Sequence, residues 1–388
     1  MVGPLQEFVG RFKRSEIEVS QALDKYLRQD FISLNEHLTQ KHIEHSDKLR
    51  GRLCVYLDTK YWIYMRDARL GSPQSPTHFR LLELLETLVR DGRIICPVTS
   101  STLHETAKIR DQSKRNEMAS IVDELSRGIA IRPMEERIQL EFFERWRKRK
   151  KVLRNHRDAH RFVWTQPSLA LGLPVPAPPK EISPKIAKAI GKILVDELMS
   201  MPFSQAMALL YPEGAILPDR HSDVIDSINA GRQDADTPQM TFKGEFPREC
   251  ADFLSSGLLI ENGQIKEPIY HPSSRPEQSL LVSDKEVYDF LVAITKTVAF
   301  ERRASVFPSM YIWAGLHTKG KVDSSSYSMN DIFDFDHACA AVPYCEAFLT
   351  ERRLSTWLRQ RPLAVNTYFD CEIVSNDKSA IKYLESLL

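Results

Sequence analysis

Residues 52–125 alternate between short apolar runs and amphipathic helical patterns, and this alternation constrains the fold more than any other feature of the 388-residue chain. The apolar run at 53–57, in RLCVYLD, predicts a strand, and THFRLLELLETLVRDG at 77–92 has the leucine spacing of a helix. RIICPVT at 93–99 predicts a second strand, which another helical pattern follows. The order strand, helix, strand, helix is typical of a parallel α/β sheet.

The same pattern returns near the C-terminus. DIFDFDHACAAVPYC at 331–345 predicts a helix that opens with acidic residues, and EAFLT at 346–350 predicts a strand. ERRLSTWLRQ at 351–360 predicts a further helix, and a weaker strand pattern follows at 371–374. We therefore predict an α/β core that is built from both ends of the chain.

Four segments follow from these patterns: an N-terminal helical segment (1–50), the first part of the core (51–134), a mostly helical insertion (135–320) and the second part of the core (321–388). The insertion is far too long for a plain connection between two elements. We expect it to shape the choice of substrate or of a protein partner, which includes a second copy of the chain.

Composition narrows the class of protein. Lys+Arg and Asp+Glu nearly cancel, at 53 against 52, so net charge does not indicate a polyanionic partner. The six cysteines form no CxxC pair, which predicts reduced thiols in a cytoplasmic protein and not a disulfide framework or a zinc site. We find no apolar run of membrane-spanning length and no signal peptide, so we predict no membrane partner.

Acidic residues stand at the ends of the predicted strands. Asp58 closes the first strand, Glu105 follows the second, and Glu351 follows the late strand. The helix that leads into the late strand carries three more acids: Asp331, Asp334 and Asp336. Because functional groups gather at the carboxyl ends of parallel strands, we expect these acids to converge on one edge of the sheet.

Convergent carboxylates repel one another and need a cation to remain ionised together. Oxygen donors without a histidine or cysteine cluster suit Mg²⁺ or Mn²⁺, and such a site can activate a water for phosphodiester hydrolysis. Each acid also has a simpler interpretation. Asp58 can cap the following helix, Glu105 can be a solvated helix residue, and the three later acids can favour a helix start.

These motifs resemble the PIN-domain ribonucleases. The matching stretches are VYLDTKYW around Asp58, PVTSSTLHETAKI around Glu105 and NDIFDFDHACAAVPYCEAFLTERRL up to Glu351. The resemblance covers about residues 52–130 and 325–375. It implies a PIN-like α/β/α sandwich with a parallel sheet, here interrupted by the large helical insertion, and metal-dependent endonuclease activity, usually on RNA.

The resemblance also implies roles for individual residues. The catalytic acids would be Asp58, Glu105, Asp334 and Glu351. The candidate ligands of Mg²⁺ or Mn²⁺ are Asp58, Glu105, Asp331, Asp334, Asp336 and Glu346. The family's spacing before Thr350 favours Asp334 as the third acid, but Asp331 and Asp336 remain open. Glu346 and Glu351 stand where the family commonly has shorter side chains.

Further residues have both functional and structural interpretations. Hydroxyls that can orient the acids or cap helices are Thr59, Thr99, Ser100 and Thr350, and His104 and His337 can line the site. The basic stretch at 145–161 predicts a nucleic-acid-binding helix, although a solvated helix face explains it equally well. Its candidate contacts are Arg147, Lys148, Arg149, Lys150, Lys151 and Arg154.

Three functional classes compete. The leading prediction is a metal-dependent endoribonuclease, whose substrate is open between transfer RNA, messenger RNA and single-stranded DNA, with a toxin or defence role also open. A haloacid-dehalogenase-type phosphatase needs a second Asp two residues after the first, where this chain has Lys60. A degenerate, non-catalytic PIN-like scaffold or nucleic-acid-binding module is the alternative from a different class.

Overall fold

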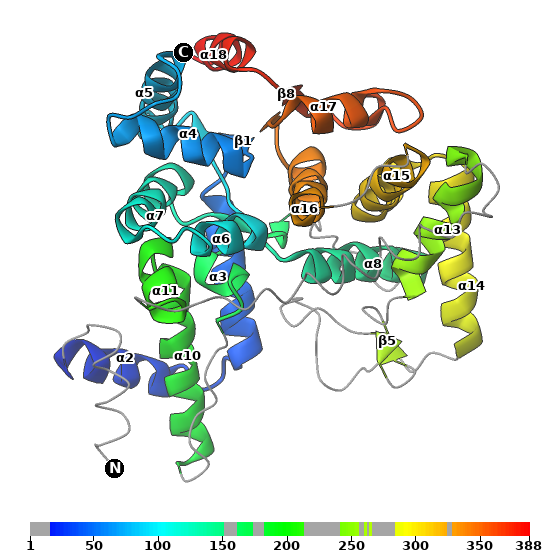
Figure 1. Cartoon of the computed structure of the whole chain (residues 1–388). Helices are drawn as coiled ribbons and strands as arrows, with labels where there is room; N and C mark the ends of the chain where they lie inside the picture. Colours follow the sequence, from blue (N-terminus) through cyan, green and yellow to red (C-terminus); the bar gives the residue numbers. More distant parts are fainter. Residues whose placement is uncertain are drawn as a thin grey trace.

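A computed structural model describes residues 16–150, 161–173, 182–212, 241–255, 260–261, 264–265, 284–323 and 328–388. Its centre is a four-stranded parallel sheet in the order β2-β1-β7-β8 (Figure 1). The strands are β1 (Leu53–Leu57), β2 (Ile94–Ile95), β7 (Ala347–Leu349) and β8 (Glu372–Val374). β2 is shorter than predicted because Pro97, within the same run, has no backbone N–H to donate to a neighbouring strand.

The two ends of the chain build one sheet, as predicted. β1 lies parallel to β7, with Val55 opposite Ala347 and Leu57 opposite Leu349. The sequence predicted both strands, and their pairing brings the loops that follow Leu57 and Leu349 to the same edge of the sheet. Side chains in these two loops are therefore close in space although they are distant in sequence.

Both faces of the sheet are covered by helices, which explains why its strands are almost continuously apolar. Alternate residues of a strand point to opposite faces. Tyr56 and Phe348 accordingly belong to one hydrophobic cluster, and Leu57 and Leu349 belong to a second. The result is three layers, helix, sheet and helix, which agrees with the predicted α/β class.

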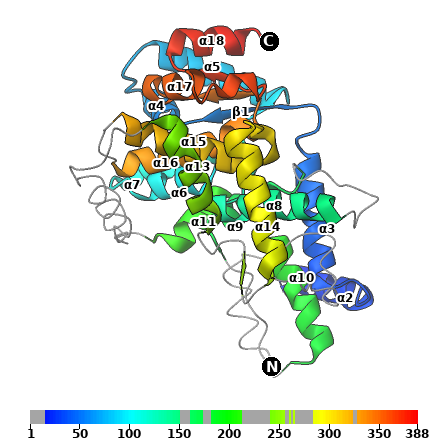
Figure 2. The same cartoon turned by 90° about the vertical axis from the view of Figure 1, so that its right-hand side faces the viewer.

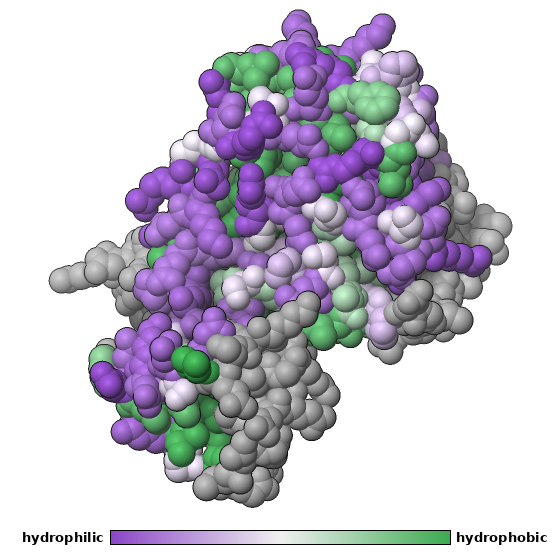
Figure 3. Space-filling view, turned by 90° about the vertical axis from the view of Figure 1, so that its left-hand side faces the viewer, coloured by the Kyte–Doolittle hydropathy of each residue, from purple (hydrophilic) through white to green (hydrophobic). Residues whose placement is uncertain are grey.

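The first helical layer contains α4 (Thr59–Arg69), α5 (Thr77–Arg90), α7 (Gln112–Ser126) and α18 (Asp377–Glu385). Leu81, Leu84, Leu85 and Leu88 of α5 are all buried in this layer. The sequence analysis predicted α5, considered a helix after Asp58 without giving its bounds, and did not assign α18. Seen from the left of Figure 1, the surface over α5, α7 and α2 is mostly hydrophilic, with apolar residues in small groups (Figure 3).

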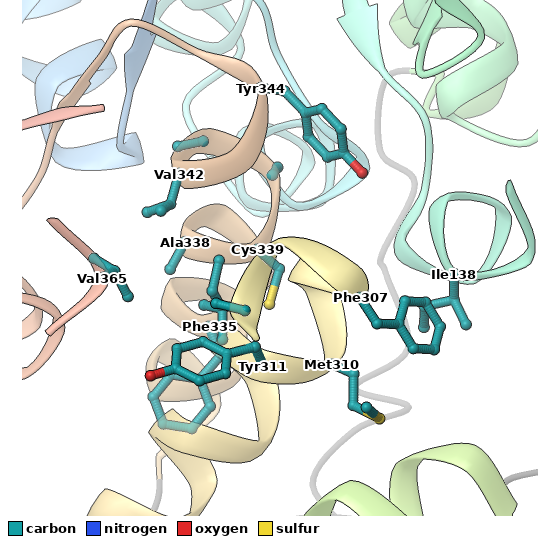
Figure 4. Close-up of a cluster of buried hydrophobic side chains, with 14 of the residues drawn as sticks. Ile138, Phe307, Met310, Tyr311, Phe335, Ala338, Cys339, Val342, Tyr344 and Val365 are labelled. Carbon is teal, nitrogen blue, oxygen red and sulfur yellow. The ribbon is translucent and has the colours of Figure 1, made fainter. Parts of the chain in front are cut away.

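The second layer contains α8 (Met134–Lys150), α15 (Pro308–Val322), α16 (Met329–Tyr344) and α17 (Arg352–Arg359). Figure 4 shows how Ile138 of α8, Tyr311 of α15 and Cys339 of α16 contribute to one buried cluster. That cluster also includes strand residues such as Tyr56. Helices of the predicted insertion therefore form part of the same core as the sheet and complete one of its two faces.

Other helices pack away from the sheet (Figure 2). α2 (Glu16–Arg28) and α3 (Leu34–Asp47) contact α10 (Pro184–Ser200), which leads into α11 (Phe203–Leu210). Among the described residues, no single helix has the length and apolar character needed to cross a membrane, whereas α10 and α11 meet that test only as a pair bent by 110°.

The remaining elements are short or peripheral, and the segment before β4 differs from the predicted structure. They are α6 (Ser100–Ala107), β3 (Ala130–Ile131), β4 (Trp164–Thr165), α9 (Pro167–Ala170), α13 (Phe242–Ser255), β5 (Ile260–Glu261), β6 (Gln264–Ile265), α14 (Asp284–Thr295), η2 (Lys296–Phe300), η3 (Ala304–Val306) and η4 (Val365–Thr367). The charged pattern at 135–163 predicts one long helix, of which the structure describes α8 up to Lys150. Phe162 and Val163 are not helical and lead into β4, which pairs with β3.

Candidate active site

Asp58 lies where β1 ends and α4 begins. It is 5% exposed, and its carboxylate accepts hydrogen bonds from the backbone N–H of Lys60 at 3.4 Å and from the hydroxyl of Thr350 at 2.8 Å. The first contact caps α4, so the capping interpretation of Asp58 is confirmed. The second contact joins Asp58 to the loop that follows β7, so the same side chain also faces the neighbouring strand end.

Glu105 reaches the same edge from α6, which follows β2. Its carboxylate accepts a hydrogen bond from the hydroxyl of Thr59, the first residue of α4. The carboxylate also lies 3.0 Å from Nε2 of His337, which α16 contributes. Glu105 is therefore held from two sides, once by the end of β1 and once by the helix that precedes β7.

His337 is fully buried and connects this edge to the interior. Its Nδ1 lies 2.7 Å from the hydroxyl of Tyr56, which is in turn 2.9 Å from the hydroxyl of Thr99. Burial lowers the pKa of the imidazole, whereas Tyr56 and the hydrogen-bonded Glu105 raise it, and the resulting pKa is well above its usual value. The charged imidazolium donates from both nitrogens, which suits the acceptors on its two sides.

The three acids at the start of α16 have different surroundings. The carboxylate of Asp331 accepts from the backbone and the hydroxyl of Ser328 in a capping box, and it pairs with Arg353 at 3.0 Å. Asp336 is buried, pairs with Arg137 at 2.7 Å and accepts from the hydroxyl of Ser101 at 2.6 Å. Both carboxylates are therefore occupied by protein groups.

Asp334 lies between Asp331 and Asp336 in sequence, but its side chain does not share their protein partners. A helix turns about 200° over two residues, so Asp334 points to a different side from Asp336. Among the residues that the structure describes, no hydrogen bond or ion pair engages the Asp334 carboxyl. Of the three acids that the sequence left open, Asp334 is the one that the fold leaves available.

The pKa of Asp334 identifies its neighbours. Burial raises this pKa to about 8, and the carboxylates of Asp58, Glu351 and Glu105 raise it as well, against a lowering effect of His337. Burial and Asp58 also raise the pKa of Glu351. The four acids that were predicted to be catalytic are thus electrostatic neighbours at one edge of the sheet. Asp58, Glu105, Asp334 and Glu351 are called the acidic edge below.

The structure does not support the prediction that Glu346 is a metal ligand. It precedes β7 and lies at the opposite end of that strand from Glu351, where it is exposed and accepts a hydrogen bond from the backbone N–H of Cys54 at 2.6 Å. A strand has two ends, and only its carboxyl end belongs to the acidic edge. The structure therefore separates Glu346 from the other acids, and we remove it from the candidate ligands together with the occupied Asp331 and Asp336.

The predicted basic contacts lie outside what the structure describes. Arg147, Lys148, Arg149 and Lys150 fall within α8, but their side chains are not among the described ones. Lys151 and Arg154 are outside the described residues altogether. Their role in binding nucleic acid stays a prediction.

Two groups of partners escaped the sequence analysis. Tyr56, in β1, contacts His337 through its hydroxyl. Its position two residues before Asp58, which places it on the same face of the strand, is the sequence feature that could have identified it. Arg137 and Ser101 hold Asp336 from α8 and α6. Arg137 could have been noticed as a cation beside apolar residues of a helix that is expected to be buried, but no nearby residue in the sequence indicated that Asp336 is its partner.

In the part of the chain that the structure describes, no three His, Cys, Asp or Glu side chains are grouped closely enough to hold one metal ion. Like-charge repulsion between carboxylates is a physical reason for such a spread. The donors of the acidic edge are nevertheless of the kind that Mg²⁺ and Mn²⁺ take, namely carboxylate oxygens.

No protein-family model matches this chain, and no curated protein and no solved structure shows significant similarity to it. The likeness to PIN domains therefore depends only on the residues and motifs described above.

The raised pKa of Asp334 predicts how stability changes with pH in the metal-free protein. The folded protein keeps this proton up to about pH 8, whereas the unfolded chain releases it near pH 4. Between these values the folded state binds more protons, so the contribution of Asp334 to the free energy of unfolding falls as pH rises. Urea unfolding in EDTA should show Asp334→Asn gaining stability relative to the wild type from pH 5 to pH 8. A pH-independent difference between the two proteins would contradict the assignment.

Proposed function

We propose that the chain is a metal-dependent endoribonuclease of the PIN-like type, with its active site at the acidic edge. One observation carries the proposal. Acids from strand ends at both halves of the chain are electrostatic neighbours, because burial and then Asp58, Glu351 and Glu105 raise the pKa of Asp334. Neighbouring buried carboxylates repel one another, and a divalent cation is a group that lets carboxylates of this number and kind ionise together.

Asp58, Glu105 and Asp334 would hold Mg²⁺ or Mn²⁺, with Glu351 beside them. When bound, such an ion supplies an activated water and neutralises the charge that develops on the leaving oxygen of a phosphodiester. The chain's own residues prepare the ligands. The hydroxyl of Thr350 orients Asp58, and the hydroxyl of Thr59 orients Glu105.

His337 contributes to this preparation from behind the acids. Its Nε2 lies 3.0 Å from Glu105 and its Nδ1 lies 2.7 Å from Tyr56, so the ring is fixed at both nitrogens. It is a positioning residue, because it contacts a proposed ligand and not the reacting atoms. A positive charge on His337 would also balance the carboxylate of Glu105.

A degenerate, non-catalytic PIN-like module remains the second candidate. The observation that favours it is that no three potential ligands are grouped around one point among the described residues. The two candidates differ in metal binding. Mn²⁺ should raise the melting temperature of a nuclease whose acids repel one another, and it should leave that of a degenerate module unchanged.

The proposed activity has a defined chemical signature. Purified protein should cut labelled single-stranded RNA with Mg²⁺ or Mn²⁺ and stop when EDTA is added. The products should carry 5′-phosphate and 3′-hydroxyl ends, because water and not the ribose 2′-hydroxyl is the expected nucleophile. End-group analysis of the cut RNA measures this.

A substrate with a single 2′-deoxy residue at the cleaved position is the matched control, and it should be cut as well as the all-ribose strand. A 2′,3′-cyclic phosphate, or cleavage that survives EDTA, would count against a catalytic role for any carboxylate of the acidic edge.

A further inference from the structure

Three cations accompany the acidic edge in sequence. Lys60 follows Asp58 by two residues, and Arg353 follows Glu351 by two. Lys108 is the C-cap residue of α6, the helix that carries Glu105. Cations this close to acids usually neutralise them by forming ion pairs, so the placement of their charged groups is informative.

The two lysines lie over aromatic rings. The ammonium of Lys60 is 5.5 Å from the ring centre of Tyr64, and the ammonium of Lys108 is 4.5 Å from that of Phe333. Among the described residues, neither lysine has a carboxylate within ion-pair distance. A cation–π contact holds an ammonium in position without removing its charge. Both lysines therefore keep a positive charge that no ion pair among the described residues neutralises.

The two lysines come from different elements that carry the acids. Lys60 lies in the first turn of α4, and its backbone N–H donates to the carboxylate of Asp58. Lys108 contacts Phe333, the residue before Asp334 on α16. Lys108 is exposed and Lys60 is partly exposed, so both are accessible from solvent.

Arg353 has a different arrangement. Its guanidinium lies 4.5 Å from the ring centre of Trp357, but it also pairs with Asp331 at 3.0 Å. Its charge is thus already balanced within the protein. Arg353 is for this reason not included in the inference.

We infer that Lys60 and Lys108 are phosphate-binding residues that hold the backbone of a single-stranded RNA at the acidic edge. The inference rests on the proposed function for the class of its ligand. Contacts to phosphates position a strand without reading its sequence. The ring beneath Lys108 agrees with this role, because Phe333 is 7% exposed and cannot offer a free face to a base.

The test is the salt dependence of binding, measured by fluorescence anisotropy with a labelled 20-nucleotide single-stranded RNA in EDTA, where cleavage is absent. Each phosphate contact to a single strand contributes about 0.7 to the slope of log K against log salt concentration. Lys60→Gln/Lys108→Gln should lower the slope by about 1.4 in magnitude. Affinity at low salt should fall about tenfold, as expected for two solvent-screened ionic contacts.

Lys25→Gln is the matched control. The ammonium of Lys25 lies 4.7 Å from the ring centre of Tyr26, so this variant also removes a cation over an aromatic ring, but on α2 (Figure 1). Lys25→Gln should leave both slope and affinity unchanged. Equal salt slopes for the wild type and both variants would overturn the inference. A loss of slope or affinity in Lys25→Gln as large as in the double variant would also overturn it, as would a wild-type RNA affinity that does not depend on salt.

Two further measurements separate this inference from the proposed function. Single-stranded DNA of the same sequence should show the same loss, because its phosphates are the same, and a loss on RNA alone would overturn the phosphate assignment. Cleavage is measured separately with Mn²⁺. Binding that depends on the lysines, without any cleavage, would contradict the nuclease proposal and support the phosphate contacts. Cleavage, together with unchanged binding by the double variant, would support the nuclease proposal and contradict the phosphate contacts.

Discussion

Replacing Asp58 with asparagine is expected to reduce RNA cleavage by about two to three orders of magnitude while the fold survives. Losses of this size follow removal of one preorganised charge-stabilising group from an active site. The substitution keeps the size of the side chain and removes one negative charge from the acidic edge. Cleavage rates with Mn²⁺, together with melting temperatures with and without the ion, measure the two effects.

The fold should survive because asparagine can replace both hydrogen bonds of Asp58. The Asn oxygen caps α4 about as well as a carboxylate does, and the hydroxyl of Thr350 can donate or accept. Without metal, the variant should be at least as stable as the wild type, because repulsion with Asp334 is relieved. The stabilisation that Mn²⁺ gives the wild type should shrink in the variant.

Asp111→Asn provides the matched control for this experiment. Asp111 caps α7 through a hydrogen bond from the backbone N–H of Lys114 at 3.1 Å, so the same change is made at another helix start. Activity should be unchanged in this control. An Asp58→Asn protein that cuts RNA as fast as the control would end the assignment of the active site to this edge.

Replacing Arg137 with methionine is expected to have the largest effect on stability. Arg137 is fully buried and its guanidinium lies 2.7 Å from the carboxylate of Asp336. Although burial raises the pKa of Asp336, Arg137 and the Ser101 hydroxyl lower it below its usual value. Removing one partner leaves a buried charge unpaired, which costs about 3–5 kcal/mol of the free energy of unfolding. Urea unfolding at pH 7 measures the loss.

The double variant Arg137→Met/Asp336→Asn is the control that identifies the cause. It removes the unpaired charge and keeps an acceptor for the Ser101 hydroxyl, so it should recover most of the lost stability. The deficit of Arg137→Met should also shrink as pH falls, because protonation of Asp336 removes the same charge. A double variant no more stable than Arg137→Met would contradict the ion-pair explanation. Recovery in the double variant would support a structural role for Asp336 as the partner of Arg137.

The sequence by itself determined the local parts of this protein. Apolar runs that end in a polar residue identified β1 and β7, because a strand buried on both faces must be almost continuously apolar. The leucine spacing identified α5, because its apolar face must meet the sheet. The acids at the ends of these strands were visible for the same reason, since a charge directly after a buried run marks the point where the chain reaches an edge.

Only the tertiary structure decided which acids belong together. The motif spacing favoured Asp334 over Asp331 and Asp336 but left all three open. In the fold, Arg353 pairs with Asp331 and Arg137 pairs with Asp336, and Asp334 has no such partner among the described residues. The sequence likewise could not separate Glu346 from Glu351. Which end of a strand faces the other acids depends on parallel pairing between segments almost 300 residues apart, and side-chain partners across such distances are set by packing and not by local pattern.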